Sequence, residues 1–262
     1  MINFIVCGLE DTLINDDNKT ISETTIDLIS TLLDEGFKFA VATGYNYQVV
    51  KPMFGKIQNK IIYICNDGGV IIYDDKVISK TPIDTLVCMD VIAEMEKDAY
   101  KNDIKILFST ERKSAILSHN YDFIRYLSAQ GIEPEFVEDI KELHGDINKI
   151  TLCSNKGFDE KSYEQIYLRW ARKANVAISN PNQIFITGPM VSKGTAIEVL
   201  QHVYEISEED TVVFGTGFSD IDMFKHCFYS YAMQWADAQV KHSAKHITES
   251  VDTILEDVMR MN

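Results

Sequence analysis

Short runs of β-branched and aromatic residues alternate with helical segments over the first 80 residues, and this alternation restricts the chain to few folds. We expect buried strands beginning at Asn3, at 37–42 and at 61–65, each followed by a polar or glycine-containing turn. A helix capped by Ser22 is expected between the first two strands, and a weaker one with Pro52 between the next two. Strand, helix and strand at this spacing predict βαβ units with a parallel sheet.

The pattern changes near Pro82. From there to about residue 184, helical segments alternate with strands whose residues are apolar and polar in turn, as in a sheet with one face in water. Parallel α/β character then resumes with strands at 184–186 and 211–214, a helix at 195–204 and a helix beyond Asp220. We therefore predict an α/β core domain from 1–82 and 185–262, and an inserted α+β domain from 83–184.

Composition and charge limit the partners of the chain. Of its 262 residues, 45% are hydrophobic and 25% are charged, which is typical of a folded globular protein. The net charge of -15 opposes binding to phosphate backbones and to anionic lipid. We expect neither nucleic acid nor a membrane as a partner.

The five cysteines are scattered along the chain and never form a CxxC pair. This pattern predicts reduced, buried thiols and gives no zinc signature. The amino-terminal residues lack a basic segment followed by an apolar stretch, and no apolar run approaches the length of a membrane span. We expect a cytoplasmic protein.

Four polar loops are expected at the same edge of the parallel sheet, because they follow strands or begin a helix. They are Gly8–Thr12, Thr43-Gly44, Ser192-Lys193-Gly194 and Gly215–Asp220. A hydroxyl, a lysine at a helix start and a glycine-rich turn together suit phosphate recognition. The candidate phosphate-binding residues are Thr43, Gly44 and Lys193.

The sequence resembles the haloacid dehalogenase superfamily, specifically its Cof-type sugar-phosphatase branch, over essentially the whole chain. The stretches that carry the resemblance are Ala42-Thr43-Gly44, residues 191–196, residues 215–223, Tyr231-Ala232-Met233 and residues 244–250. The resemblance implies a Rossmann-like core with a parallel sheet and an inserted α/β cap. It also implies Mg²⁺-dependent hydrolysis of small phosphorylated metabolites such as sugar phosphates.

The first loop departs from the family pattern. In the family this loop carries Asp-x-Asp-Gly-Thr, in which the first Asp attacks phosphorus and the second is the general acid and base. Alignment on Thr12 places Gly8 at the nucleophile, Glu10 at the acid/base and Asp11 at the glycine. Gly8 has no side chain that could attack phosphorus. Glu10 is the remaining candidate catalytic residue.

The metal ligands implied by the resemblance are also incomplete. The family binds Mg²⁺ with the nucleophilic Asp, a carbonyl of the first loop and acids of a Gly-Asp-Gly-x-Asn-Asp motif. Here Thr216 replaces the first of those acids and Ser219 the Asn, whereas Asp220 remains. Mg²⁺ needs charged oxygen ligands, so we expect weak or absent binding. Tyr45 also stands where a basic residue is common in this branch.

These residues are compatible with three functions. The first is a pseudoenzyme that binds a phosphorylated small molecule, and the second is an active hydrolase that recruits Glu10 or Asp11. The third is an interaction protein without a pocket ligand. Lys193 has two alternatives, since it either favours a bound anion or forms an ion pair with Glu10 or Asp220. Trp235 is expected to fill part of the region beside the site.

Overall fold

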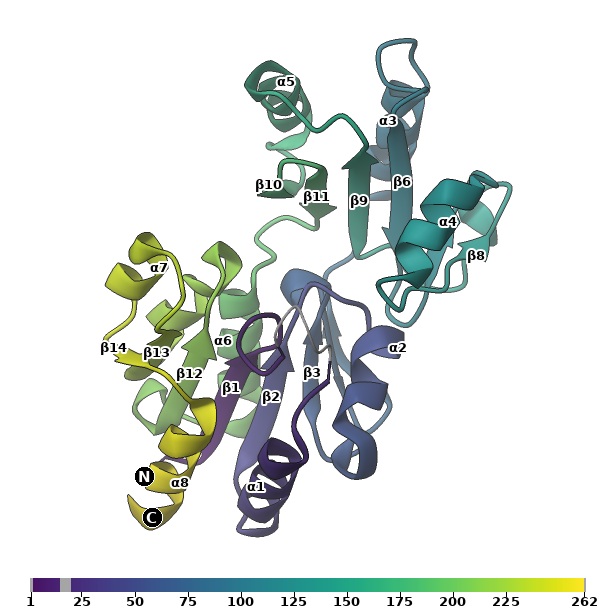
Figure 1. The fold of residues 1–262 in the computed structure, drawn as a ribbon. Helices are drawn as coiled ribbons and strands as arrows, with labels where there is room; N and C mark the ends of the chain where they lie inside the picture. The colour runs from purple at the N-terminus through teal and green to yellow at the C-terminus, as the bar shows by residue number, and fades with distance from the viewer. Residues whose placement is uncertain (1, 15–19, 262) are drawn as a thin grey trace. The chain divides into compact units, whose positions relative to one another are not determined.

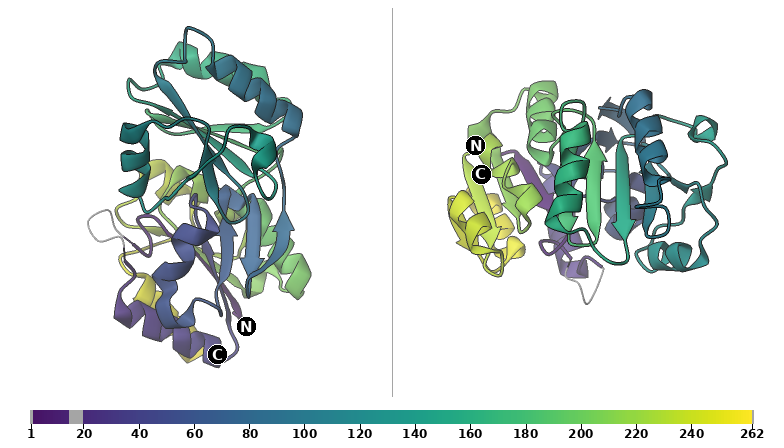
Figure 2. Two further views of the ribbon diagram at one scale, coloured as in Figure 1. Left: turned by 90° about the vertical axis from the view of Figure 1, so that its right-hand side faces the viewer. Right: turned by 90° about the horizontal axis from the view of Figure 1, so that it is seen from above.

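The computed structural model describes residues 2–14 and 20–261, which fall into two compact units (Figures 1 and 2). The core unit comprises the described residues of 1–45, 50–79 and 192–262. The inserted unit comprises 46–49 and 80–191, and its longer segment begins and ends a few residues outside the predicted range of 83–184.

The core unit contains an eight-stranded sheet in the order β14-β13-β12-β1-β2-β3-β4-β5 (Figure 1). The first six strands of this order are parallel, and β4 is antiparallel to β3. The predicted parallel α/β sheet is therefore confirmed. The strands are β1 (Phe4–Gly8), β2 (Lys38–Ala42), β3 (Ile62–Cys65), β4 (Val70–Tyr73), β5 (Lys76–Lys80), β12 (Thr211–Gly215), β13 (Tyr229–Met233) and β14 (His246–Thr248).

Helices pack on this sheet, and α1 lies beside α8 (Figure 1). Ser22 caps α1 as predicted, because its hydroxyl accepts the N–H of Thr25 at 3.0 Å. The short α2 runs from the inserted unit into the core unit at Val50 and leads into a 3-10 segment, Lys51–Ile57, in which Gly55 has a φ of 46°. The helices are α1 (Glu23–Asp34), α2 (Tyr47–Val50), α6 (Lys193–Tyr204), α7 (Ala238–Ser243) and α8 (Val251–Met261).

The prediction of a regular helix beyond Asp220 was wrong. The chain forms two short 3-10 turns instead, at Phe218–Asp220 and Met223–His226. It has to enter β13 at Tyr229 soon after leaving β12, and Cys227 is already extended with a φ of −149°. A short connection between two neighbouring parallel strands therefore replaces the expected helix.

One face of the core sheet is covered by α6. Phe4 and Val6 on β1 share this face because alternate residues of a strand point the same way. They form one buried cluster with Ile197 and Leu200 of α6. This packing fixes the start of α6, and with it Lys193, against the carboxyl ends of the central strands.

The inserted unit has a six-stranded sheet in the order β10-β11-β9-β6-β7-β8. Its paired strands are antiparallel apart from β7 and β8, which are parallel. Its strands are β6 (Ile104–Ser109), β7 (Ser114–Ile116), β8 (Glu135–Phe136), β9 (Lys149–Ser154), β10 (Asn175–Asn180) and β11 (Gln183–Thr187). Its longer helices are α3 (Thr85–Met95), α4 (Tyr121–Ser128) and α5 (Glu160–Trp170).

Strand β11 corrects one prediction. The strand at 184–186 was expected to open the second half of the core, but it lies between β10 and β9 in the inserted sheet. The apolar residues of β11 explain this placement, since Ile184 pairs with Leu152 and Ile186 with Ile150 inside the buried cluster of the inserted unit.

All five cysteines are buried and free, as the sequence predicted. Burial, which removes the thiolate from water, raises the pKa of Cys88 and Cys153 to about 12. These thiols therefore stay protonated near neutral pH. None of the helices among the residues that the structure describes has the length and apolarity that crossing a bilayer requires.

The packing of α6 on the sheet gives a direct prediction of stability. Leu200→Ala removes a fully buried side chain from this contact and should lower the free energy of unfolding by about 2–5 kcal/mol. Val199→Ala, one position along the same helix and 36% exposed, is the control and should change it by less than about 0.5 kcal/mol. Urea denaturation followed by circular dichroism measures both, and equal losses would contradict this account of the core.

Candidate functional site

The carboxyl ends of three neighbouring strands bring the predicted site residues together in the core unit. β1 lies between β2 and β12, with Gly8 paired to Ala42 and Cys7 paired to Phe214. Because these strands are parallel, the loops that follow them meet at one edge of the sheet. The start of α6 reaches the same edge, so Lys193 joins the residues of these loops.

A buried ion pair lies at the centre of this site. Lys193 is the first residue of α6, and its Nζ lies 2.7 Å from Oδ1 of Asp220, with side chains that are 5% and 3% exposed. The other carboxylate oxygen, Oδ2, accepts the backbone N–H groups of Thr216 and Gly217, each at 2.9 Å. Both oxygens of Asp220 are therefore engaged by protein donors.

Lys193 is positively charged in this setting. Burial would lower the pKa of its ammonium group, but Asp220, and then Glu10 and Asp67, outweigh burial and raise that pKa above its usual value. Of the alternatives left open for Lys193, the structure has the ion pair with Asp220. An anion that entered the site would meet a lysine whose charge is already balanced.

Thr43 and Glu10 are joined directly. The Thr43 hydroxyl is fully buried and donates to Oε1 of Glu10 at 2.7 Å, while the N–H of Tyr45 donates to the same hydroxyl at 3.1 Å. Gly44 continues the turn after Thr43 at this end of β2. The predicted phosphate-binding hydroxyl thus lies at the site, but a carboxylate occupies the position where it would contact a phosphate oxygen.

The first loop has an unusual backbone and a crowded start. Asp11 has a φ of 55° in the left-handed region that glycine adopts most easily. Gly8 ends β1, and a Cβ placed on it would lie 3.1 Å from both Oδ2 of Asp220 and Oγ1 of Thr12. The end of β1 therefore presents no side chain to the site.

Hydroxyl and indole groups connect this loop to two others. Thr216 Oγ1 donates to the carbonyl oxygen of Asp11 at 2.9 Å, and Trp235 Nε1 donates to the same oxygen at 2.8 Å. Thr12 Oγ1 lies 2.7 Å from Thr216 Oγ1. The sequence indicated that Trp235 lies beside the site, but it did not predict the hydrogen bond of the indole or the contact between Thr12 and Thr216. A tryptophan or a threonine in a sequence does not reveal which distant residue it will bind.

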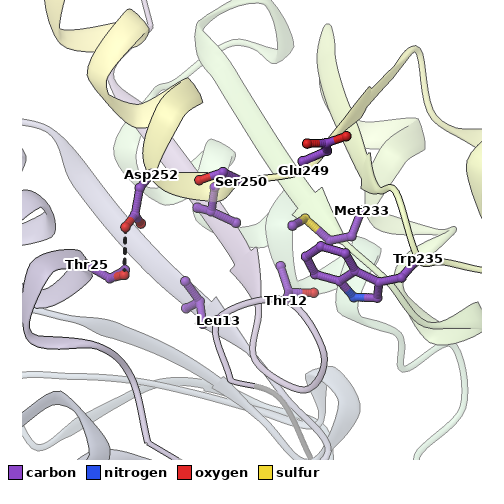
Figure 3. Close-up of a pocket in the computed structure, with 9 residues that line it drawn as sticks. Thr12, Leu13, Thr25, Met233, Trp235, Glu249, Ser250 and Asp252 are labelled. Carbon is purple, nitrogen blue, oxygen red and sulfur yellow. Dashed lines mark hydrogen bonds between the residues drawn. The ribbon is translucent and has the colours of Figure 1, made fainter.

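A cavity of about 180 Å³ lies behind the first loop, within the core unit. Its wall includes Thr12 and Leu13 from the loop, the indole of Trp235 and the start of α8 (Figure 3). Asp252 on that wall accepts a hydrogen bond from Thr25 at 3.1 Å. Trp235 and the first loop therefore line the same cavity, and the indole N–H is bonded to that loop.

The residues at the site do not fit Mg²⁺. In proteins this ion has near-octahedral oxygen coordination, with one or two carboxylates and several waters. Within the described residues, no three acidic, histidine or cysteine side chains are grouped so that they could hold a metal ion. Asp220 has both oxygens engaged, Gly8 supplies no ligand, and Thr216 supplies a neutral hydroxyl.

Comparison with known proteins identifies the family. The sequence profile of the haloacid dehalogenase-like hydrolases matches residues 5–254. The 5-amino-6-(5-phospho-D-ribitylamino)uracil phosphatase of Escherichia coli is 22% identical over 255 residues, which span 94% of this chain and 90% of that protein. The chain belongs to the haloacid dehalogenase-like hydrolase family.

Solved structures agree on the fold. A haloacid dehalogenase-like hydrolase from Bacteroides thetaiotaomicron matches with a TM-score of 0.86 at 19% identity, over 98% of this chain and 100% of that one. A subclass IIB sugar phosphatase of the superfamily matches with a TM-score of 0.81 at 19% identity, over 98% and 99%. The predicted superfamily, its Cof-type branch and the α/β fold are confirmed.

The buried ion pair should contribute more to the free energy of unfolding than an ion pair on the surface does. Lys193→Met leaves a buried carboxylate without its cation and should cost about 3–5 kcal/mol of unfolding free energy. Asp220→Asn turns an amide N–H₂ toward the ammonium and should also destabilise. The double variant removes both conflicts, so its cost should be smaller than the sum of the two single costs.

Urea denaturation of these variants measures the coupling between the two residues. Lys60→Met is the matched control, because Lys60 pairs with Asp34 at the same distance of 2.7 Å but with side chains 54% and 66% exposed. Removing that exposed pair should cost less than about 1 kcal/mol. Additive costs at Lys193 and Asp220 would contradict a direct interaction between them.

Proposed function

We propose that this chain has kept the phosphatase fold and binds a phosphorylated small molecule without hydrolysing it. The observation that carries the proposal is the end of β1, where Gly8 takes the position of the nucleophile and leaves no carboxylate. Loss of a covalent nucleophile costs a hydrolase on the order of a millionfold in rate. The changes at Thr216 and Ser219 in the second motif point the same way.

Recognition of a phosphate group is supported by the donors that remain. Thr43 brings a hydroxyl to the end of β2, and Lys193 brings a charge to the start of α6, where a helix amino end favours anions. Two of the proteins named above are phosphatases, one of a phosphorylated ribitylamino compound and one of sugar phosphates. The ligand class we propose is therefore a phosphorylated metabolite, sugar phosphates included, within the cytoplasm.

The negative charge and the position of Glu10 disfavour binding of a phosphate group. Its carboxylate holds the Thr43 hydroxyl, and together with Asp220 it sets two negative charges against the single charge of Lys193. A phosphate that reaches Thr43 has to displace Glu10 from that hydroxyl. Binding of the ligand and movement of the Glu10 side chain are therefore one event in this proposal.

We also propose that Mg²⁺ binds weakly or not at all, although members of the superfamily generally depend on it. The support is the donor set, in which Asp220 is the one acid left from the family pattern and both of its oxygens accept protein hydrogen bonds. A divalent ion would have to break those bonds before it could be coordinated.

One observation favours the alternative of an active hydrolase. Glu10 is an acid at the site whose Oε1 accepts the Thr43 hydroxyl. A carboxylate in this position is a candidate general base for water. If this alternative holds, hydrolysis depends on Glu10 and not on a covalent intermediate at the end of β1.

The charge of Glu10 gives a testable prediction about binding. Glu10→Gln keeps an acceptor for Thr43 but removes one negative charge, so it should raise the affinity for inorganic phosphate or a sugar phosphate by at least about tenfold. Thr43→Val, of similar shape but without the hydroxyl, should lower it. The rise in melting temperature with added ligand measures both effects.

Glu209→Gln is the matched control, since it removes an exposed acid of the core unit just before β12, at the opposite end of that strand from the site. It should leave the ligand-induced shift unchanged. If no phosphorylated compound shifts the melting temperature of the wild type or of Glu10→Gln, the proposal is wrong and an interaction protein without a pocket ligand is favoured.

Catalysis is tested separately by release of inorganic phosphate from p-nitrophenyl phosphate and sugar phosphates with MgCl₂. The proposal expects no release above that of a preparation without the protein. Release that Glu10→Gln abolishes would establish the hydrolase alternative. Release that survives in Glu10→Gln would show catalysis by another group and would contradict both accounts.

A further inference from the structure

Three loops of the core unit converge on one backbone atom, the carbonyl oxygen of Asp11. That oxygen belongs to the loop after β1 and accepts the Thr216 hydroxyl from the loop after β12, at 2.9 Å. It also accepts the indole N–H of Trp235 from the loop after β13, at 2.8 Å. A carbonyl oxygen has two lone pairs, so this acceptor is fully used.

The Thr12 hydroxyl joins this cluster from the same loop as Asp11. Its single hydrogen has two acceptors within reach, the Thr216 hydroxyl at 2.7 Å and the carbonyl oxygen of Glu10 at 3.3 Å. The Thr216 hydroxyl gives its own hydrogen to Asp11. Thr12, Thr216 and Trp235 therefore surround the backbone of the first loop with hydrogen bonds from three loops.

This network engages oxygen atoms of the three loops in hydrogen bonds. Both carboxylate oxygens of Asp220 accept protein donors, and the Asp11 carbonyl and Thr216 hydroxyl take part in short hydrogen bonds. A divalent ion joins loops by drawing their oxygens around one charge. Here neutral O–H and N–H donors join the loops, and one ammonium group neutralises the one carboxylate between them.

We propose that Thr12, Thr216 and Trp235 take the place of a divalent cation in holding these three loops together, so that the site is assembled without metal. The three are positioning residues in this proposal. The inference concerns the assembly of the loops and stands independently of which ligand the site binds.

Trp235 provides the readout. The chain has two tryptophans, and Trp170 lies in the inserted unit, where its Nε1 donates to Asp90. A ¹⁵N-labelled sample of the full chain therefore gives two indole N–H signals in a heteronuclear NMR spectrum. Trp235→Phe assigns them by removing one. The Trp235 signal reports the bond to Asp11 directly, which a merely packed side chain would not do.

The hydroxyl of Thr216 is tested with two substitutions. Thr216→Val keeps the shape but removes the hydrogen bonds, so we expect the Trp235 indole signal to shift and the melting temperature to fall by about 2–4 °C. Thr216→Ser restores the hydroxyl and should return both values to those of the wild type. The Trp170 signal should stay constant in all variants. An unchanged Trp235 signal in Thr216→Val would overturn the proposal.

The metal part of the proposal is tested in the same samples, with no phosphate compound present, so that failure of ligand binding cannot affect the result. Wild-type melting temperature and indole signals should be equal in EDTA and in millimolar MgCl₂. Thr216→Asp breaks the network and adds a carboxylate, so MgCl₂ should raise its melting temperature. The proposal that this network takes the place of a cation would be contradicted by either of two results. One is a wild-type melting temperature that rises with MgCl₂, and the other is a Thr216→Asp melting temperature that does not.

Discussion

The site depends on one buried ion pair. Lys193 and Asp220 lie almost completely out of water, where each charge alone would be strongly unfavourable. Two backbone N–H groups complete the shell of Asp220, and the pair thereby fixes the start of α6 to the turn after β12. Since Asp220 balances the lysine charge, an incoming anion also meets the negative charges of Glu10 and Asp67.

Around that pair, backbone positions and side chains contribute separately to the site. The parallel order of β2, β1 and β12 delivers three loops to one edge, and Asp11 gives the first of them a left-handed turn. Glycine and threonine stand at positions 8 and 216, where the resemblance to the family implies carboxylates. Fold and reaction are separable here, because the fold needs backbone positions and the reaction needs side-chain oxygens.

The sequence predicted those parts of the molecule that depend on local pattern. Periodicity and a cap at Ser22 located α1, and motif spacing located Thr43, Lys193 and Asp220. It placed β11 in the wrong sheet, because an apolar run does not specify its partner strand. It also missed the bonds from Thr216 and Trp235 to Asp11, which link residues 205 and 224 positions apart and depend on tertiary structure alone.

The crowding around Gly8 has a consequence for substitution at the end of β1. A side chain at this position would begin 3.1 Å from the oxygens of two residues, Thr12 and Asp220, which is closer than most Cβ atoms come to a neighbour. Both side chains would have to shift by a few tenths of an ångström to make room. A carboxylate introduced here would also lie beside the negative charge of Asp220, so the space that Gly8 leaves open helps Asp220 to stay paired with Lys193 alone.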